Sequence, residues 1–168
     1  MNATVPALSV LIAVLATAVP WGLPGDATFI PPMVVVMMVF CWRALPDTAF
    51  PPYLALLLGL LTDIMSGGPL GFWALMALIG ASVGGRVTSL ADSQDRNRLW
   101  LVWAGVAVLI GVLSWLLGSA YFVRWIDWWP IAFGAIASTL LFPVVLRVVV
   151  WLRRGRLRLG PKLYRGLS

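Results

Sequence analysis

The sequence predicts an all-α integral membrane protein, a bundle of about six transmembrane helices with both termini in the cytoplasm. Hydrophobic residues make up 61% of the 168 residues, charged residues make up only 11%, and the mean hydropathy is +0.97. These values lie far from those of soluble domains. Helices are favoured over barrel strands because the apolar windows have helical lengths, and helices satisfy their own backbone hydrogen bonds in lipid.

Apolar windows and breaking residues divide the chain into six segments, at 5–23, 28–42, 50–65, 69–90, 99–121 and 128–152. The second and third are short for spans, since a span needs about 20 residues. The second begins at Ile30-Pro31-Pro32, where proline can start a helix but not continue one. We therefore expect residues 1–152 to form one six-helix transmembrane domain, followed by a basic tail at 153–168.

Positive charge is distributed unevenly between the two sides of this bundle. Arg124 is the one cation on the side opposite the termini, and Arg147 lies inside the last segment. The side of the termini holds the others, which are Arg43, Arg86, Arg96, Arg98, Arg153, Arg154, Arg156, Arg158, Lys162 and Arg165. The positive-inside rule then places both termini in the cytoplasm.

The composition excludes several kinds of chemistry. The chain has no His, and its six acidic residues are all Asp and are scattered along the sequence. The single Cys41 lies in an apolar run and cannot form an internal disulfide. We therefore predict a protein that is not an enzyme, with no catalytic group, no metal site and no cofactor.

The tail carries Arg153, Arg154, Arg156 and Arg158 directly after the last segment. Charge alone is compatible with nucleic acid, but a position next to a span argues against it. Cations there are attracted to an anionic leaflet of the phospholipid bilayer. We interpret these arginines as a membrane anchor, and a docking site for a cytoplasmic partner is the alternative.

Asp63 is the only charged residue between Tyr53 and Gly85. Gly67 and Gly68 can take positive φ to end one helix, and Pro69 can begin the next. Asp63 or Ser66 would then accept hydrogen bonds from backbone amides exposed by the turn. This pattern predicts a capped tight hairpin.

A second interpretation of Asp63 is a contact with a partner chain or a ligand. Ala55, Gly59 and Asp63 are four residues apart and share one helix face, which Gly67 continues, followed by Gly71 in the turn. Small residues there allow another helix to approach closely. Arg124, on the same side of the membrane, is the candidate partner for the carboxylate.

Two further lines of small residues are candidates for helix packing. Ser9, Ala13 and Thr17 repeat every four residues in the first segment, and Gly80 and Gly84 form a GxxxG motif. Such lines usually mark contacts inside one bundle. An interface with another subunit is the alternative.

The stretch LLGLLTDIMSG at 57–67, followed by Pro69-Leu70-Gly71 and a small-residue helix over 74–85, resembles the MreD family of rod-shape-determining proteins. The layout of the whole chain is similar as well, while the motif covers about 30 residues. The resemblance implies a non-enzymatic inner-membrane scaffold of the bacterial cell-elongation machinery, which synthesises peptidoglycan. It implies binding to MreC, association with RodA and its penicillin-binding protein, and an indirect link to MreB.

The MreD family is also similar in fold to the substrate-binding subunits of energy-coupling-factor vitamin transporters. This similarity supplies an alternative function. In that case the aromatic cluster at Tyr121, Phe122, Trp125, Trp128 and Trp129 would line the ligand site, and the Ser9-Ala13-Thr17 line would dock a coupling subunit.

Overall fold

The computed structural model describes residues 3–19, 22, 28–46, 50–88 and 96–159. Within these ranges every regular element is a helix, which confirms the prediction of an all-α fold. The helices are α1 (Thr4–Thr17), α2 (Ile30–Ala44), α3 (Pro52–Ser66), α4 (Phe72–Arg86), α6 (Arg96–Phe122) and α7 (Trp129–Leu159).

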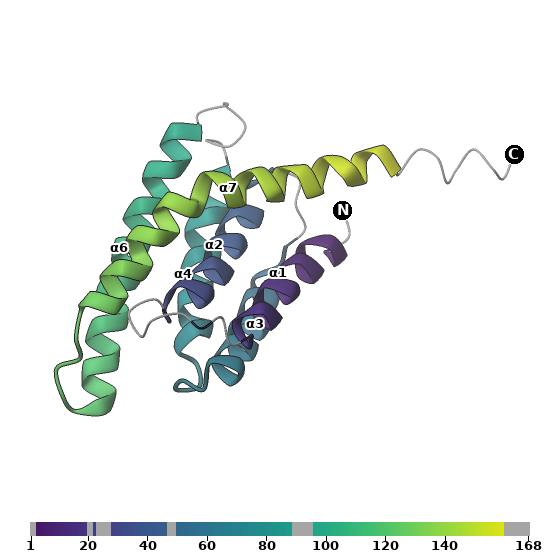
Figure 1. Ribbon diagram of the computed structural model, residues 1–168. Coiled ribbons are helices and arrows are strands. Elements are labelled where there is room, and N and C mark those ends of the chain that lie inside the picture. The colour runs from purple at the N-terminus through teal and green to yellow at the C-terminus, as the bar shows by residue number, and fades with distance from the viewer. Residues whose placement is uncertain (1–2, 20–21, 23–27, 47–49, 89–95, 160–168) are drawn as a thin grey trace, which may run out of the picture.

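Helix α2 lies at the centre of the bundle and contacts α1, α3, α4 and α7 (Figure 1). Its residues from Met33 to Trp42 are all buried except Val34. A helix that is apolar on every side is stable only when other helices surround it or lipid covers it. The core therefore forms around α2, and α3 and α4 pack together beside it.

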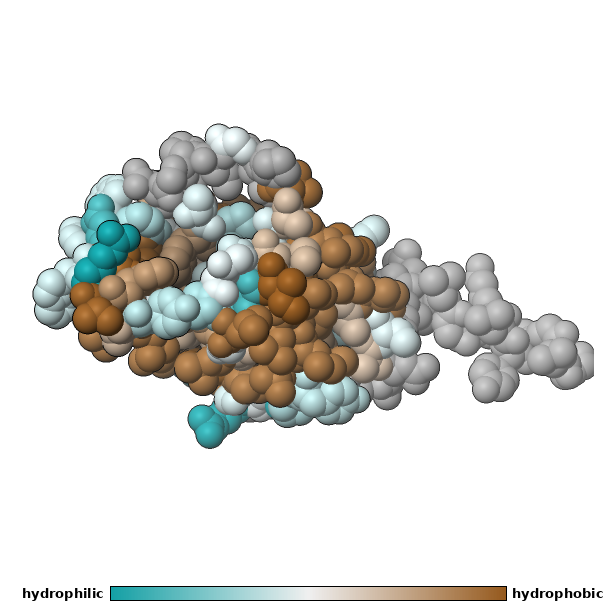
Figure 2. All heavy atoms as spheres, turned by 90° about the horizontal axis from the view of Figure 1, so that it is seen from below, coloured by the Kyte–Doolittle hydropathy of each residue, from teal (hydrophilic) through white to brown (hydrophobic). Residues whose placement is uncertain are grey.

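Helices α6 and α7 form a long antiparallel pair joined at 123–128. Helix α6 has 27 residues and the apolar part of α7 has 26, so both are long and apolar enough to cross a membrane. Helices α1 to α4 are also apolar but have only 14 or 15 residues each. Figure 2 shows a broad hydrophobic surface on the face seen from below.

The two ends of the chain differ from the predicted segments. Helix α1 ends at Thr17 and not at Leu23, because Pro20 and Pro24 follow it and cannot continue a helix. Helix α7 does not stop at Leu152 but continues to Leu159. Leu and Arg are good helix formers, so the first part of the basic tail extends the helix.

Trp103 lies near the predicted start of the fifth apolar segment, where tryptophan is typical of a membrane interface. Trp103 is fully buried in the core and not at an interface. Its ring stacks on Phe142 with centroids 6.0 Å apart and lies 5.3 Å from the ring of Phe40. Trp103 therefore joins α6 to α2 and α7 as a core residue.

Candidate functional site

The connection between α3 and α4 is built on two glycines with positive φ. Gly67 ends α3 at φ 67°, and Gly71 precedes α4 at φ 93°. Side chains other than glycine rarely adopt these conformations. The sharp hairpin that the sequence predicted is therefore present, but its second positive φ lies at Gly71 and not at Gly68, and α4 begins at Phe72 and not at Pro69.

Asp63 reaches from α3 to the N-terminus of α4. Its Oδ2 accepts hydrogen bonds from the backbone N–H of Gly71 at 2.9 Å and of Ala74 at 3.4 Å, and its Oδ1 accepts one from Trp73 at 2.7 Å. The carboxylate is fully buried. A negative charge at a helix N-terminus is favourable because the free amides there carry partial positive charge. Asp63 therefore has the geometry of a cap supplied by the neighbouring helix.

Helix α4 covers the face that carries Ala55, Gly59 and Asp63, and all three are buried within the chain. A Cβ atom at position 59 would collide with the Cα atom of Ala74. Gly59 is thus a point at which the backbones of α3 and α4 approach closely. A partner chain would reach this face only if α4 moved away.

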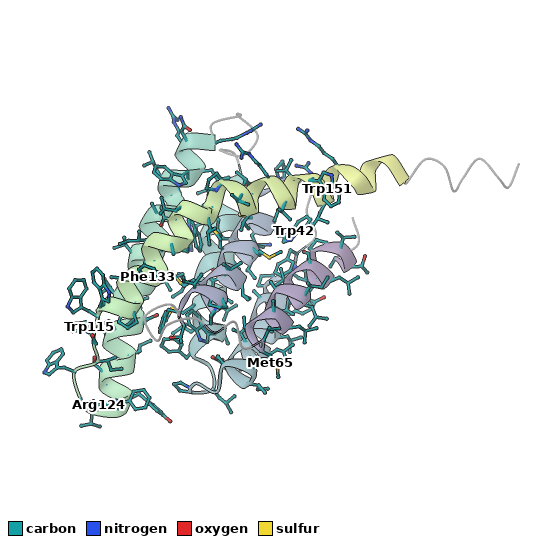
Figure 3. The ribbon with its side chains drawn as sticks, viewed as in Figure 1. Trp42, Met65, Trp115, Arg124, Phe133 and Trp151 are labelled. Atoms are coloured by element: carbon teal, nitrogen blue, oxygen red, sulfur yellow. The ribbon has the colours of Figure 1, made fainter. Side chains whose placement is uncertain are left out.

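Arg124 is not near Asp63. It is exposed in the connection between α6 and α7, and Figure 3 places it well apart from Met65 at the end of α3. The structure therefore does not bring together the charge pair that the sequence suggested.

The GxxxG motif of α4 faces α2. A Cβ atom at Gly84 would lie 2.6 Å from the carbonyl oxygen of Phe40, and one at Gly80 would lie 3.0 Å from Cγ1 of Val36. Both glycines therefore allow α4 to lie directly against the central helix.

The line of small residues in α1 is half-buried beside the buried residues Val10 and Val14. Ser9 accepts a hydrogen bond from the indole Nε1 of Trp42 in α2 at 2.9 Å. The hydroxyl of Thr17 donates to a carbonyl of its own helix at 2.6 Å, and Ala13 lies between the two. Ser9 thus joins α1 to the central helix.

The arginines of the predicted anchor fall on the last part of α7. Arg154 is exposed and Arg153 is half-buried. The side chains of Arg156 and Arg158 lie outside the described residues, as do Lys162 and Arg165.

The aromatic cluster at the connection between α6 and α7 is largely exposed. Trp115 stacks on Trp125 with ring centroids 5.2 Å apart, and its Nε1 donates to the carbonyl of Ile126 at 2.9 Å. Asp127 accepts a hydrogen bond from the backbone N–H of Trp129 at 3.2 Å. These contacts fix the connection, but they leave the aromatic rings at the surface (Figure 3).

An apolar groove of about 460 Å³ runs between α6 and α7 next to this cluster. Gly111 and Ala135 are buried at its floor, and exposed residues such as Val112 and Ile136 form its walls. The complete lining is Val108, Gly111, Val112, Trp115, Trp128, Ile131, Ala132, Ala135 and Ile136. No polar side chain apart from the indole nitrogens lines it.

Sequence reasoning did not identify this groove as a site. The signal that could have found it is the small residues Gly111, Ala132 and Ala135 in two helices joined by a short connection. Because these residues are far apart in the chain, their meeting depends on how α6 and α7 pack.

Within the ranges that the structure describes, no three His, Cys, Asp or Glu side chains lie close enough together to hold a metal ion. Comparisons with protein-family models, with curated proteins and with solved structures found no match for this chain.

Proposed function

We propose that this chain is a multi-pass protein of the bacterial inner membrane that acts as a non-enzymatic scaffold subunit of the cell-elongation complex. Its direct partner in this proposal is MreC, a protein with a single membrane span, and RodA, its penicillin-binding protein and MreB follow through the complex. The resemblance of the α3–α4 hairpin to the MreD family supports this assignment.

The observation that carries the proposal is the apolar groove between α6 and α7. Helices associate in lipid by close packing, and small residues at the contact let two backbones approach. The groove offers small residues at its floor, at Gly111, Ala132 and Ala135, and apolar walls on an exposed part of the chain. It is therefore the surface on which we place the membrane-spanning helix of MreC.

The α3–α4 hairpin supports the same location indirectly. Asp63, Gly59 and Ala55 are already used in packing α3 against α4. The hairpin therefore stabilises the bundle, and we place the contact with the partner on the long helices α6 and α7.

The first experiment is affinity purification of the tagged native protein in mild detergent, with bound proteins identified by mass spectrometry. We expect MreC and wall-synthesis proteins to be retained. A transporter coupling protein with ATPases, or a retained vitamin, would contradict the scaffold and favour the transporter function. A water-soluble vitamin would need polar groups, which the lining of this groove lacks.

A pair of variants then locates the contact. Val112→Trp fills the groove, whereas Leu109→Trp places the same large side chain at an exposed position of α6 outside it. We expect Val112→Trp to lose most of the bound MreC while Leu109→Trp keeps it. Equal retention of MreC by both folded variants would exclude the groove as the contact.

A further inference from the structure

Helix α7 contains Pro143, which cannot donate a hydrogen bond to the carbonyl of Thr139. The indole Nε1 of Trp100 in α6 donates to this carbonyl at 2.9 Å instead. Helix α6 thus satisfies the backbone at the position where proline interrupts it. Figure 1 shows that α7 changes direction in its middle and that its second half leaves α6.

The second half of α7 has two different faces. Phe142, Leu146 and Val149 are buried and belong to the core. The opposite face is exposed and repeats every three or four residues, with Val144, Arg147, Val148, Trp151 and Arg154. This outer face therefore mixes cations with aliphatic and aromatic side chains.

Neither water nor hydrocarbon suits this outer face. Trp151 is 71% exposed beside exposed valines, which is unfavourable in water. Arg147 and Arg154 are equally unfavourable in hydrocarbon. The headgroup region suits both kinds of side chain, since tryptophan and arginine prefer it to either neighbouring phase.

The length of α7 agrees with this placement. The path along α7 from Trp129 to Arg147 is about 27 Å, of which about 21 Å precede the bend at Pro143, and a hydrocarbon core is roughly 30 Å thick. With Trp129 at one interface, Arg147 lies near the other, and its long side chain can extend to the headgroups.

No described acidic side chain is placed to neutralise these arginines. Asp63 is occupied at the N-terminus of α4, and Asp127 precedes α7 at its other end. The chain adds Arg156 and Arg158 beyond Arg154. The charge of this face is therefore complementary to an anionic surface.

We propose that the outer face of α7 after Pro143 binds the headgroups of anionic phospholipids through Arg147 and Arg154, with Trp151 at the level of the headgroups. This inference rests on the membrane location in the proposed function but on none of its protein partners.

The test uses the purified full chain in vesicles of phosphatidylcholine and phosphatidylglycerol in equal parts. Spin-labelled forms of the two lipids report which one the protein holds at its surface. We expect a preference for phosphatidylglycerol that falls by about fivefold for each arginine replaced in Arg147→Gln and Arg154→Gln. The preference should also fall as salt is added.

Two controls separate this site from charge in general. Arg147→Lys keeps the charge and should keep most of the preference, and Arg124→Gln removes an exposed cation at the other end of α7 and should leave it unchanged. A double Arg147→Gln and Arg154→Gln variant with the wild-type preference would overturn the proposal. If Arg124→Gln lowered the preference for phosphatidylglycerol as much as Arg147→Gln does, the proposal would also be overturned.

The assay contains no other protein, so a failure to find MreC in the purification does not affect it. A chain that does not enter the vesicles at all would contradict the membrane location itself, and with it the proposed function.

Discussion

Gly59 and Gly84 differ from Gly105 and Gly111 of the α6–α7 hairpin in what a side chain at each position would meet. In the α3–α4 hairpin and its contact with α2, Gly59 and Gly84 lie where a Cβ atom would strike backbone. In the α6–α7 hairpin, Gly105 faces open space and Gly111 meets side chains only at 3.6 and 3.9 Å, whereas Gly118 and Gly134 have a side-chain atom 2.9 Å from the Cβ position. Small residues in apolar helices thus allow backbones to touch at Gly59 and Gly84, whereas Gly111 forms part of an open groove.

The largest effect should come from Gly59→Leu. The added side chain has no space beside Ala74, so α3 and α4 must separate and the bundle should not fold. Gly105→Leu is the matched control, because nothing lies within 4 Å of its Cβ position. Size-exclusion chromatography and thermal unfolding followed by tryptophan fluorescence measure the difference. Equal melting temperatures would remove the distinction between the two hairpins.

The second largest effect is the difference in stability lost when the Asp residue of each hairpin is replaced. Asp63→Ala leaves the buried N–H groups of Trp73 and Ala74 and the partly buried N–H of Gly71 without this acceptor, and an unsatisfied buried group costs about 1–3 kcal/mol. Asp127→Ala removes one exposed cap bond and should cost about 0.5–1 kcal/mol. The free energy of unfolding in detergent measures both.

Asp63→Asn refines this result, because it keeps one carbonyl oxygen but replaces the other with a donor. We expect a loss smaller than that of Asp63→Ala. If the Asp63→Asn protein folds as well as the wild type but fails to bind MreC, the interpretation of Asp63 as a partner contact would be supported.

A third, smaller difference concerns single methyl groups. Gly84→Ala places a Cβ atom 2.6 Å from the carbonyl oxygen of Phe40, so α4 must shift against α2 at a cost of about 1–3 kcal/mol. Gly111→Ala meets only ordinary contacts, and alanine is favoured over glycine in a helix by about 0.5–1 kcal/mol. We expect Gly84→Ala to lower the free energy of unfolding and Gly111→Ala to raise it. A Gly84→Ala variant that is more stable than the wild type would contradict the close contact.

The smallest difference concerns single hydroxyl groups. Ser9→Ala removes the acceptor of the Trp42 indole, a contact between helices that is worth about 0.6 kcal/mol on average in membrane bundles. Ser119→Ala removes a longer bond of 3.3 Å to the N–H of Ile126 and should cost less. Thermal unfolding of the two variants checks which one lowers the melting temperature more. A larger decrease in Ser119→Ala than in Ser9→Ala would contradict this prediction.

Local signals in the sequence predicted the helices and the α3–α4 turn, because Gly67 can adopt a positive φ that other residues avoid. The second positive φ lies at Gly71 and not at the predicted Gly68. The two interpretations of Asp63 required knowledge of where α4 begins in space. Sequence alone did not decide between them, since the three donors lie eight to eleven residues further along the chain.

Contacts between distant residues account for what the sequence did not predict. Trp103 is buried because Phe40 and Phe142 meet it from two other helices, and Thr139 is satisfied by Trp100 across the α6–α7 pair. The groove has the same origin. Apolar composition marks all of these residues alike, so only packing separates core from surface.

The difference in helix length has a consequence for the lipid around the proposed membrane protein. Helices α1 and α3, with 14 and 15 residues, are about 21–23 Å long, whereas α6 with its 27 residues is about 40 Å long. A bilayer that covers the apolar surfaces of both must be thinner beside α1 and α3 than beside α6, at a cost that grows with each ångström of mismatch. The protein would therefore carry a gradient of membrane thickness with it, and neighbours with short spans would fit best on its thin side.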